Sequence, residues 1–169
     1  RAADTYTSTA TTVLDRDGGN KEAFFNQGGS RSVFANYEKS PTQSSRVFAV
    51  KPSSNFDSFL QYNDNTSNES KLRFKSSTGD HTLVVNIDKL LNKTAYGFDD
   101  NNSGSASNGV IGQTNTSLTL PTTTDNLRPL YMRIGMHMSQ NSGFLNSPIS
   151  RLTFWKTRLP NSSLINITK

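Results

Sequence analysis

Acidic side chains are the first place to look for chemistry in this chain of 169 residues. Glycoside hydrolysis requires two carboxyl groups a fixed distance apart across the sugar, one acting as acid and the other as base or nucleophile. Most acidic residues here stand alone, and the close sets are Asp15 with Asp17 and Asp99 with Asp100. Both sets lie among turn-forming residues rather than inside a strand pattern. A glycan-degrading enzyme is therefore the least supported of the functions considered below.

Nucleophilic catalysis finds no better support in the sequence. The chain has two histidines, and it has no cysteine. His81 follows Asp80 in a turn-like segment, and His137 stands between two methionines at the end of a strand pattern. A Gly-x-Ser-x-Gly nucleophile elbow is also absent from the sequence. Surface or packed positions are the simpler interpretation for both histidines, and we predict that the domain is not an enzyme.

One loop carries the type of ligand that Ca²⁺ prefers. Asp99, Asp100 and Asn101 place oxygen-bearing side chains at consecutive positions, and hard oxygen ligands suit this ion. Ca²⁺ also needs ligands that converge from several parts of a protein, and acidic turns are common without a metal. The sequence therefore offers these three residues as candidate calcium ligands, with a plain acidic turn as the alternative and no other cofactor expected.

Sugar binding commonly uses an exposed aromatic ring that stacks on the sugar, together with polar loop groups that bond its hydroxyls. Tyr62 precedes a long polar loop and is the aromatic residue we expect to be exposed. Trp155 is instead expected to pack under a closing helix, because its strand leads directly into that helix. The candidate carbohydrate-binding residues are Tyr62, Asn63, Asp64, Tyr131 and Arg133.

Short strand patterns separated by turns must position these residues. The alternation is clearest at Lys71–Lys75, where apolar and cationic side chains take turns. Segments rich in Asn, Asp, Gly and Ser, such as Asp99–Asn108, are typical of turns, and Asp88–Asn92 is expected to form a helical turn. Strands are expected at Arg31–Tyr37, Ser45–Lys51, Ser58–Asn63, Lys71–Lys75, Thr82–Ile87, Thr94–Phe98, Gly109–Gly112, Leu118–Leu120, Leu130–Met136 and Ile149–Trp155. This pattern predicts an all-β fold, an antiparallel two-sheet β-sandwich.

The end of the chain predicts a change from strand to helix. Ile149–Trp155 alternates with a period of two, as a strand does. Pro160 with Asn161 supplies a helix start, and the apolar residues that follow are near helical spacing, so one or two helical turns should close the chain. We expect residues 1–12 to be an extended lead-in or linker from an upstream region, and residues 13–169 to be a single domain.

Charge and hydropathy indicate which classes of binding partner are not expected. The net charge is +5, but the 18 Lys and Arg residues are spread singly along the chain, whereas proteins that follow a phosphate backbone usually concentrate their positive charge. No apolar run approaches the length of a membrane span. Neither nucleic-acid binding nor membrane insertion is expected.

Several motifs, taken in their order along the chain, resemble one family. The closing run Arg151-Leu152-Thr153-Phe154-Trp155, followed by Arg158-Leu159 and a short helix, resembles the end of the concanavalin A-like (laminin G-like) jelly-roll domains of bacteriophage tail-fibre and virion structural proteins. Further likenesses are the opening Arg1-Ala2-Ala3-Asp4, the pair Ala95–Phe98 and Asn108-Gly109, and the strand Leu130–Gly135. The resemblance refines the predicted sandwich to a jelly roll.

The resemblance implies a function and a location. It implies a non-enzymatic adhesion module on a tail fibre or similar appendage of an extracellular phage particle, binding glycan on the host cell surface. The alternative is a capsid decoration or fibre assembly domain with no ligand. Its partners would be other virion proteins and copies of itself, a trimer included. Because one fold supports many functions, the step from fold to function here is an analogy.

Overall fold

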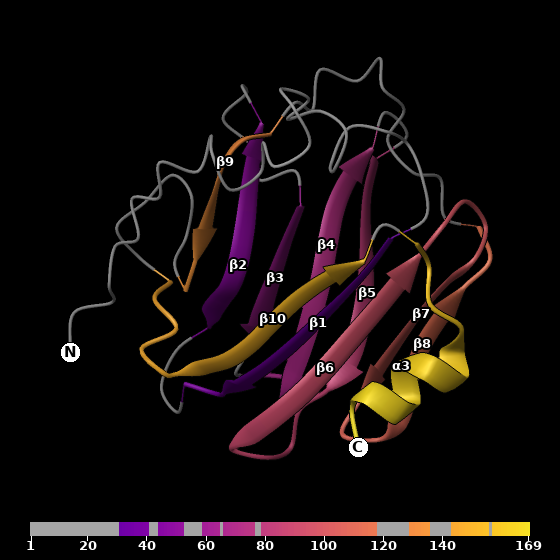
Figure 1. The fold of residues 1–169 in the computed structure, drawn as a ribbon. Helices are drawn as coiled ribbons and strands as arrows, with labels where there is room; N and C mark the ends of the chain where they lie inside the picture. The colour runs from indigo at the N-terminus through magenta and orange to yellow at the C-terminus, as the bar shows by residue number, and fades with distance from the viewer. Residues whose placement is uncertain are drawn as a thin grey trace.

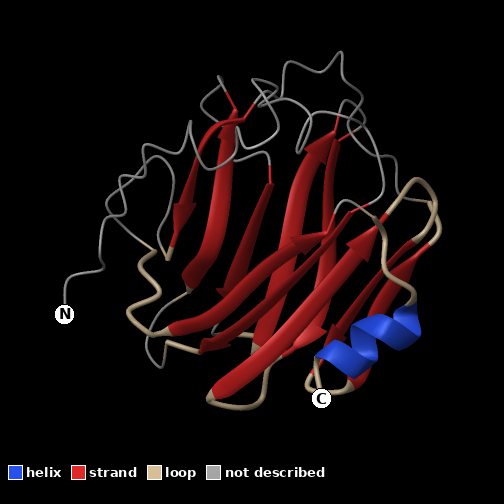
Figure 2. Ribbon diagram, viewed as in Figure 1, coloured by secondary structure: helices blue, strands red, loops and turns tan. Residues whose placement is uncertain are grey.

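The computed structural model describes residues 31–40, 44–52, 59–64, 66–76, 79–117, 129–135, 143–155 and 157–169. Within these ranges the chain forms two antiparallel sheets of five strands each, with one short helix on the outside (Figures 1 and 2). The predicted all-β sandwich with a short C-terminal helix is therefore confirmed. Residues 1–12, and with them the predicted lead-in, lie outside the described residues.

The strands divide between two sheets whose neighbours are hydrogen-bonded. Sheet A contains, in spatial order, β10 (Ile149–Trp155), β1 (Arg31–Glu38), β6 (Leu91–Phe98), β7 (Ser103–Ser107) and β8 (Val110–Asn115). Sheet B contains β5 (Gly79–Asn86), β4 (Glu69–Ser76), β3 (Phe59–Asp64), β2 (Ser45–Pro52) and β9 (Pro129–Ile134). In sheet A, the first and last of the described strands, β1 and β10, pair with each other.

The strand predictions are confirmed at nine segments, with small differences at their ends. The segment 118–120 lies outside the described residues. Three predictions were wrong. His81, expected in a turn-like segment, lies in β5. Asp88–Asn92 forms a bend and the start of β6 instead of a helical turn, and the segment Asp99–Asn108 is a strand, β7, between two turns.

The core lies between the two sheets. It is built from side chains that alternate inward on both, and the ring of Phe48 in sheet B meets the edge of Phe154 in sheet A at 5.3 Å between centroids. Polar groups are also buried here and bond to one another. The hydroxyl of Tyr37 donates to Asn63 Oδ1 at 2.8 Å, and Gln61 Nε2 donates to Thr94 Oγ1 at 2.8 Å. Both bonds join the two sheets, so the core fixes their relative position as well as burying apolar surface.

The helix α3 (Asn161–Ile167) packs on the outer face of sheet A (Figure 1). Leu164 is fully buried there against Phe34, Ala95 and Ala106, with Trp155, Leu159, Ile165 and Ile167 around it. The expectation that Trp155 packs near the closing helix is confirmed. No helix among the described residues has the length and apolar character needed to cross a membrane.

Side chains close the sandwich at the edge formed by β5. The backbone N–H of Val84 donates to Gln113 Oε1 at 3.1 Å, and its carbonyl accepts from Ser105 Oγ at 2.8 Å. The carbonyl of Asn86 accepts from Ser107 Oγ at 2.7 Å. These bonds satisfy backbone groups that an edge strand would otherwise present to another chain. They also tie the end of β5 to β7 and β8, which matters for a pocket described below.

Candidate functional site

The outer face of sheet B brings apolar, aromatic and charged side chains of the described residues together. The register places Arg133, Ala49, Leu60, Arg73 and Thr82 in one row across β9, β2, β3, β4 and β5. Residues paired in this way point to the same face of a sheet. Ala49 and Leu60 form a small apolar cluster with Tyr62, separate from the core between the sheets. The row thus has two apolar residues, Ala49 and Leu60, between two arginines. At the usual strand spacing the backbones of Arg133 and Arg73 are about 14 Å apart. We refer to Ala49 and Leu60 as the apolar floor.

A β-bulge brings a third arginine to this face. The register shifts between Arg46 and Phe48, and Val47 and Phe48 both belong to the core cluster. Strict alternation would have sent Arg46 to the same side as Phe48, but the extra residue reverses this. Arg46 therefore lies opposite Tyr62 on β3, with its guanidinium 4.9 Å from the centre of the tyrosine ring. Bulges often redirect a side chain beside a binding site.

The two arginines of β2 and β9 lie near each other. Arg133 on β9 is the register partner of Ala49 on β2. After Ala49, the next residue of β2 that points to the same face is Arg46, which is paired with Tyr62. The bulge makes the step along β2 from Ala49 to Arg46 three residues long, so the Cα atoms of Arg46 and Arg133 on adjacent strands are about 10 Å apart. Two guanidinium groups at that separation, with a tyrosine ring and small apolar side chains beside them, can hold a carboxylate and the apolar side of a small ring at once.

Lys71, the register partner of Tyr62 on β4, connects two carboxylates of the same face. Its ammonium Nζ lies 2.9 Å from Asp64 Oδ2 and 3.0 Å from Glu69 Oε2. The hydrogen bond from Lys71 lowers the pKa of Asp64, and a hydrogen bond from Ser67, followed by the one from Lys71, lowers that of Glu69. The two carboxylates in turn raise the pKa of Lys71. Both acids remain ionised at neutral pH, so neither has the raised pKa that a catalytic proton donor needs.

Arg73 is a further charged residue of this face. It pairs with Asp80 of β5, and both side chains are close to half exposed. Exposed pairs of this kind contribute little to stability and exchange readily with solvent. We refer to Arg46, Lys71, Arg73 and Arg133 together as the cationic face. Lys71 and Arg73 are held by carboxylates, and Arg46 is held over an aromatic ring.

The structure separates the predicted sugar-binding residues. Tyr62 lies half-buried on the cationic face, and Arg133 lies at its β9 edge. Asp64 is tied to Lys71 at the end of β3. Asn63 is fully buried between the sheets, where its amide bonds to Tyr37 and Ser45. This burial removes Asn63 from the groups that could touch a ligand at the surface.

Tyr131 is the remaining predicted site residue, and two further members of the site became visible only in the structure. Tyr131 pairs with Lys51 in the register, but its side chain lies outside the described residues. Arg46 and Arg73 were not among the predicted site residues. The alternating cations of Lys71–Lys75 were the one sequence signal that pointed to this face. Nothing in the sequence could have revealed the bulge that redirects Arg46, because it depends on the pairing with β3.

The candidate calcium ligands form a tight turn between β6 and β7. The backbone groups of Asp99 and Asn102 bond to each other in both directions, at 3.0 and 3.2 Å, and Asn101 has a φ of 55°. Asp99 Oδ1 accepts the N–H of Asp100 at 2.9 Å. The turn is therefore stabilised by its own bonds, which is the plain acidic turn given above as the alternative. Among the described residues no group of three or more His, Cys, Asp or Glu could hold a metal ion, and calcium at Asp99, Asp100 and Asn101 stays a prediction.

Comparison with known proteins shows the fold. No family model matches the chain, and no curated protein matches its sequence. Among solved structures, the CBM40 of a Ruminococcus gnavus IT-sialidase bound to α2,3-sialyllactose is similar with a TM-score of 0.72 at 16% identity, covering 92% of this chain and 90% of that one. CBM40 is a carbohydrate-binding module with a β-sandwich jelly-roll fold. At this identity the likeness supports the predicted jelly-roll sandwich and nothing finer.

Two larger proteins contain a similar sandwich. The leech intramolecular trans-sialidase matches with a TM-score of 0.71 at 17% identity, over 92% of this chain and 25% of that one. The NanB sialidase of Streptococcus pneumoniae matches with a TM-score of 0.64 at 12% identity, over 83% of this chain and 24% of that one. The chain thus spans about a quarter of these enzymes. None of the structures named here is a virion protein, and the phage assignment stays a prediction.

Proposed function

We propose that this domain is a non-catalytic carbohydrate-binding module that binds an acidic sugar, with terminal sialic acid as the best candidate, on the cationic face of sheet B. The observation that carries the proposal is the placement of Arg46, Tyr62 and Arg133 around the floor formed by Ala49 and Leu60. A guanidinium recognises a carboxylate through two parallel hydrogen bonds. The aromatic and aliphatic groups beside it suit the apolar side of a sugar ring.

The comparisons support this proposal at the level of the fold. The CBM40 structures from Ruminococcus gnavus are bound to α2,3- and α2,6-sialyllactose, in which a sialic acid is joined to a neutral disaccharide. A sialic acid carries the carboxylate that a pair of arginines would recognise, whereas lactose alone does not. Selectivity for the sialylated sugar over lactose is therefore the property that separates this proposal from non-specific binding of glycans.

The decisive experiment compares 3′-sialyllactose with lactose by isothermal titration calorimetry. We expect binding of the first and none of the second. Arg133→Gln and Arg46→Gln should each weaken binding at least tenfold, because the loss of a charged hydrogen bond is worth about 1.5–3 kcal/mol. Arg151→Gln is the matched control, since it removes the same charge from an exposed arginine of sheet A. Equal binding of both sugars, or an equal loss in the control, would contradict the proposal.

The absence of catalysis belongs to the same proposal. Asp64 and Glu69 flank Lys71 on the same face as the proposed site, and the groups around them lower the pKa of both. A glycosidase needs one carboxyl group that is protonated before reaction. Incubation with 3′-sialyllactose should therefore release no free sialic acid. Release that is abolished by Asp64→Asn or Glu69→Gln would show that a catalytic role had been missed.

The wider setting is proposed on the sequence resemblance alone. The closing motif around Phe154 and Trp155 supports an extracellular phage particle, with the domain on a tail fibre or similar appendage and self-association, a trimer included, among its contacts. Assembly without a ligand is the corresponding alternative. Light scattering of the purified domain measures its oligomeric state. A monomer at high concentration that still binds 3′-sialyllactose would favour the binding module over the assembly domain.

A further inference from the structure

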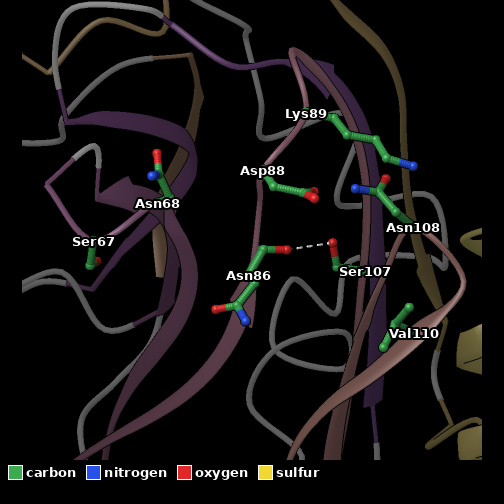
Figure 3. A pocket seen from close by; sticks show the side chains of 8 residues that line it. All are labelled: Ser67, Asn68, Asn86, Asp88, Lys89, Ser107, Asn108 and Val110. Carbon is green, nitrogen blue, oxygen red and sulfur yellow. Dashed lines mark hydrogen bonds between the residues drawn. The ribbon is translucent and has the colours of Figure 1, made fainter.

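A second hollow lies at the end of the sandwich, apart from the cationic face. It has a volume of about 510 Å³ and is formed where the β3–β4 turn, the β5–β6 bend and the β7–β8 turn converge (Figure 3). Pockets that hold small molecules typically have volumes of about 300–1,000 Å³. Its lining residues are Ser67, Asn68, Asn86, Asp88, Lys89, Ser107, Asn108 and Val110.

The walls of this end pocket are held in place before any ligand arrives. The N–H of Ile87 donates to the carbonyl of Asn68 at 2.8 Å, which ties the β3–β4 turn to the end of β5. Asn108 bonds to both backbone groups of Lys93, at 2.9 and 3.0 Å, and this fixes the β7–β8 turn. The bond from Ser107 to the carbonyl of Asn86 joins the two sides (Figure 3). A preformed site avoids the entropy cost of ordering loops on binding.

The lining residues offer both hydrogen-bond donors and hydrogen-bond acceptors, and they carry no net charge. Asp88 is exposed and makes no hydrogen bond within the described chain, and Figure 3 shows its carboxylate directed toward the β7–β8 side. Lys89 beside it supplies ammonium donors, and the amide nitrogen of Asn68 supplies further donors, since its oxygen is bonded to Lys39. Among the lining residues one carboxylate and one ammonium balance each other, and the ammonium of Lys39 is bonded to Asn68 Oδ1. The pocket therefore favours a neutral ligand whose groups both donate and accept, as hydroxyl groups do.

One wall of the end pocket is apolar. Val110 lines it and leaves 67% of its surface exposed. An isolated exposed valine is ordinary on a protein surface. Beside a set of polar groups it gives the pocket one apolar and one hydrogen-bonding side, which matches a pyranose ring with C–H bonds on one face and hydroxyls around its rim. Together these features point to a ring-shaped polyol rather than an anion or a metal ion.

We infer that the end pocket is a second carbohydrate site, which takes a neutral sugar residue through Asp88, Lys89 and Asn68 with Val110 against the ring. It is distinct from the cationic face, which lies on the outer face of sheet B and carries the arginines. The two sites would allow one domain to bind an acidic residue and a neutral residue of a glycan coat. Each site alone would be weak, and the affinity of the domain for a dense glycan surface would rise through multivalency.

The test is an NMR titration of isotopically labelled protein with methyl β-galactoside, methyl α-mannoside and methyl β-glucoside, and with glycerol as an acyclic polyol. At least one methyl glycoside should shift the backbone signals of Asn68, Asp88 and Val110 with millimolar affinity, while glycerol should not. Asp88→Ala should weaken this binding at least tenfold. Val110→Arg should abolish it by filling the pocket, while Thr114→Arg, an exposed position on the same strand, should leave it unchanged.

The outcomes separate the two proposals. A site in the end pocket is overturned if no methyl glycoside shifts these signals, if glycerol shifts them equally, or if Asp88→Ala and Val110→Arg bind like the parent. The cationic face is judged separately, from shifts at Tyr62 and Arg133 on addition of 3′-sialyllactose. Loss of either set of shifts leaves the other proposal standing, because the two sets of residues do not overlap.

Discussion

Removing the side chain of Leu164 should destabilise the domain without affecting ligand binding. Leu164 is fully buried, and a Cβ added to Gly97 would lie 3.3 Å from its Cδ1, so it rests directly on β6. Leu→Ala changes in protein interiors cost about 2–5 kcal/mol. The helix lies on the outside of a sheet and can partly settle into the space, so we expect about 3 kcal/mol for Leu164→Ala. For a domain of this size that is a fall of about 6–12 °C in Tm.

The assay is thermal unfolding followed by circular dichroism, with a calorimetric titration of 3′-sialyllactose on the same samples. Asn166→Ala is the control, because Asn166 is exposed on the same helix and should change stability by no more than about 0.5 kcal/mol. Affinity should be unchanged in both variants, since α3 and the cationic face cover opposite sides of the sandwich. A Tm for Leu164→Ala within about 2 °C of the control would refute the energetic role assigned to the helix.

Three further predictions concern the buried tyrosine, the lysine of the cationic face and the helix as a whole. Burial raises the pKa of Tyr37 to about 12, from an ordinary value of 10.0. Above pH 10 the unfolded chain therefore loses this proton first, and the free energy of unfolding should fall between about pH 10 and 12. In denaturant melts, the free energy of unfolding of Tyr37→Phe should fall less steeply over this range. At neutral pH it should be about 1–2 kcal/mol lower than that of the parent, because Asn63 Oδ1 loses its donor. Lys71→Gln should raise the pKa of Asp64 toward its usual range, as NMR titration of the carboxyl carbon would detect, and an unchanged value would exclude Lys71 as the cause. Truncation before Pro160 should abolish the cooperative melting transition by uncovering the outer apolar cluster of sheet A, and a truncated chain that still melts cooperatively would contradict this.

The regular strands could be predicted because their side chains alternate between a buried and an exposed face. Lys71–Lys75 and Ile149–Trp155 are examples, and both became strands at the predicted positions. β7 was missed because Ser103–Ser107 consists only of serine, glycine and alanine and lacks the β-branched and aromatic residues that indicate a strand. Gly104 and Ala106 must be small because α3 covers their side of the strand, whereas Ser105 and Ser107 bond to β5 on the other side. A Cβ at Gly104 would lie 2.6 Å from Asn161 Oδ1, so the sequence of β7 reflects a neighbour more than fifty residues away.

The site was predicted only in part, and the reason is the period of the strand. Tyr62, Asn63 and Asp64 were grouped because they stand together before a polar loop, but neighbours on a strand point to opposite faces. The structure consequently leaves Tyr62 on the outside and sends Asn63 into the core. Arg133 joins Arg46 across a pairing of β2 with β9 that no local pattern specifies. A site assembled across strands needs the register, and the register of distant strands depends on the whole core.

The placement of α3 on sheet A explains why the outer face of sheet B can serve for ligand binding. A sheet of a sandwich buries one face in the core, and the other must be either covered or polar. Sheet A is covered by an apolar cluster around Leu164, and its burial adds stability on that side. Sheet B instead carries charged side chains, and its exposed pair of Arg73 with Asp80 contributes little to stability. Substitutions on the cationic face should therefore change binding at small cost in folding, whereas substitutions under α3 should do the reverse.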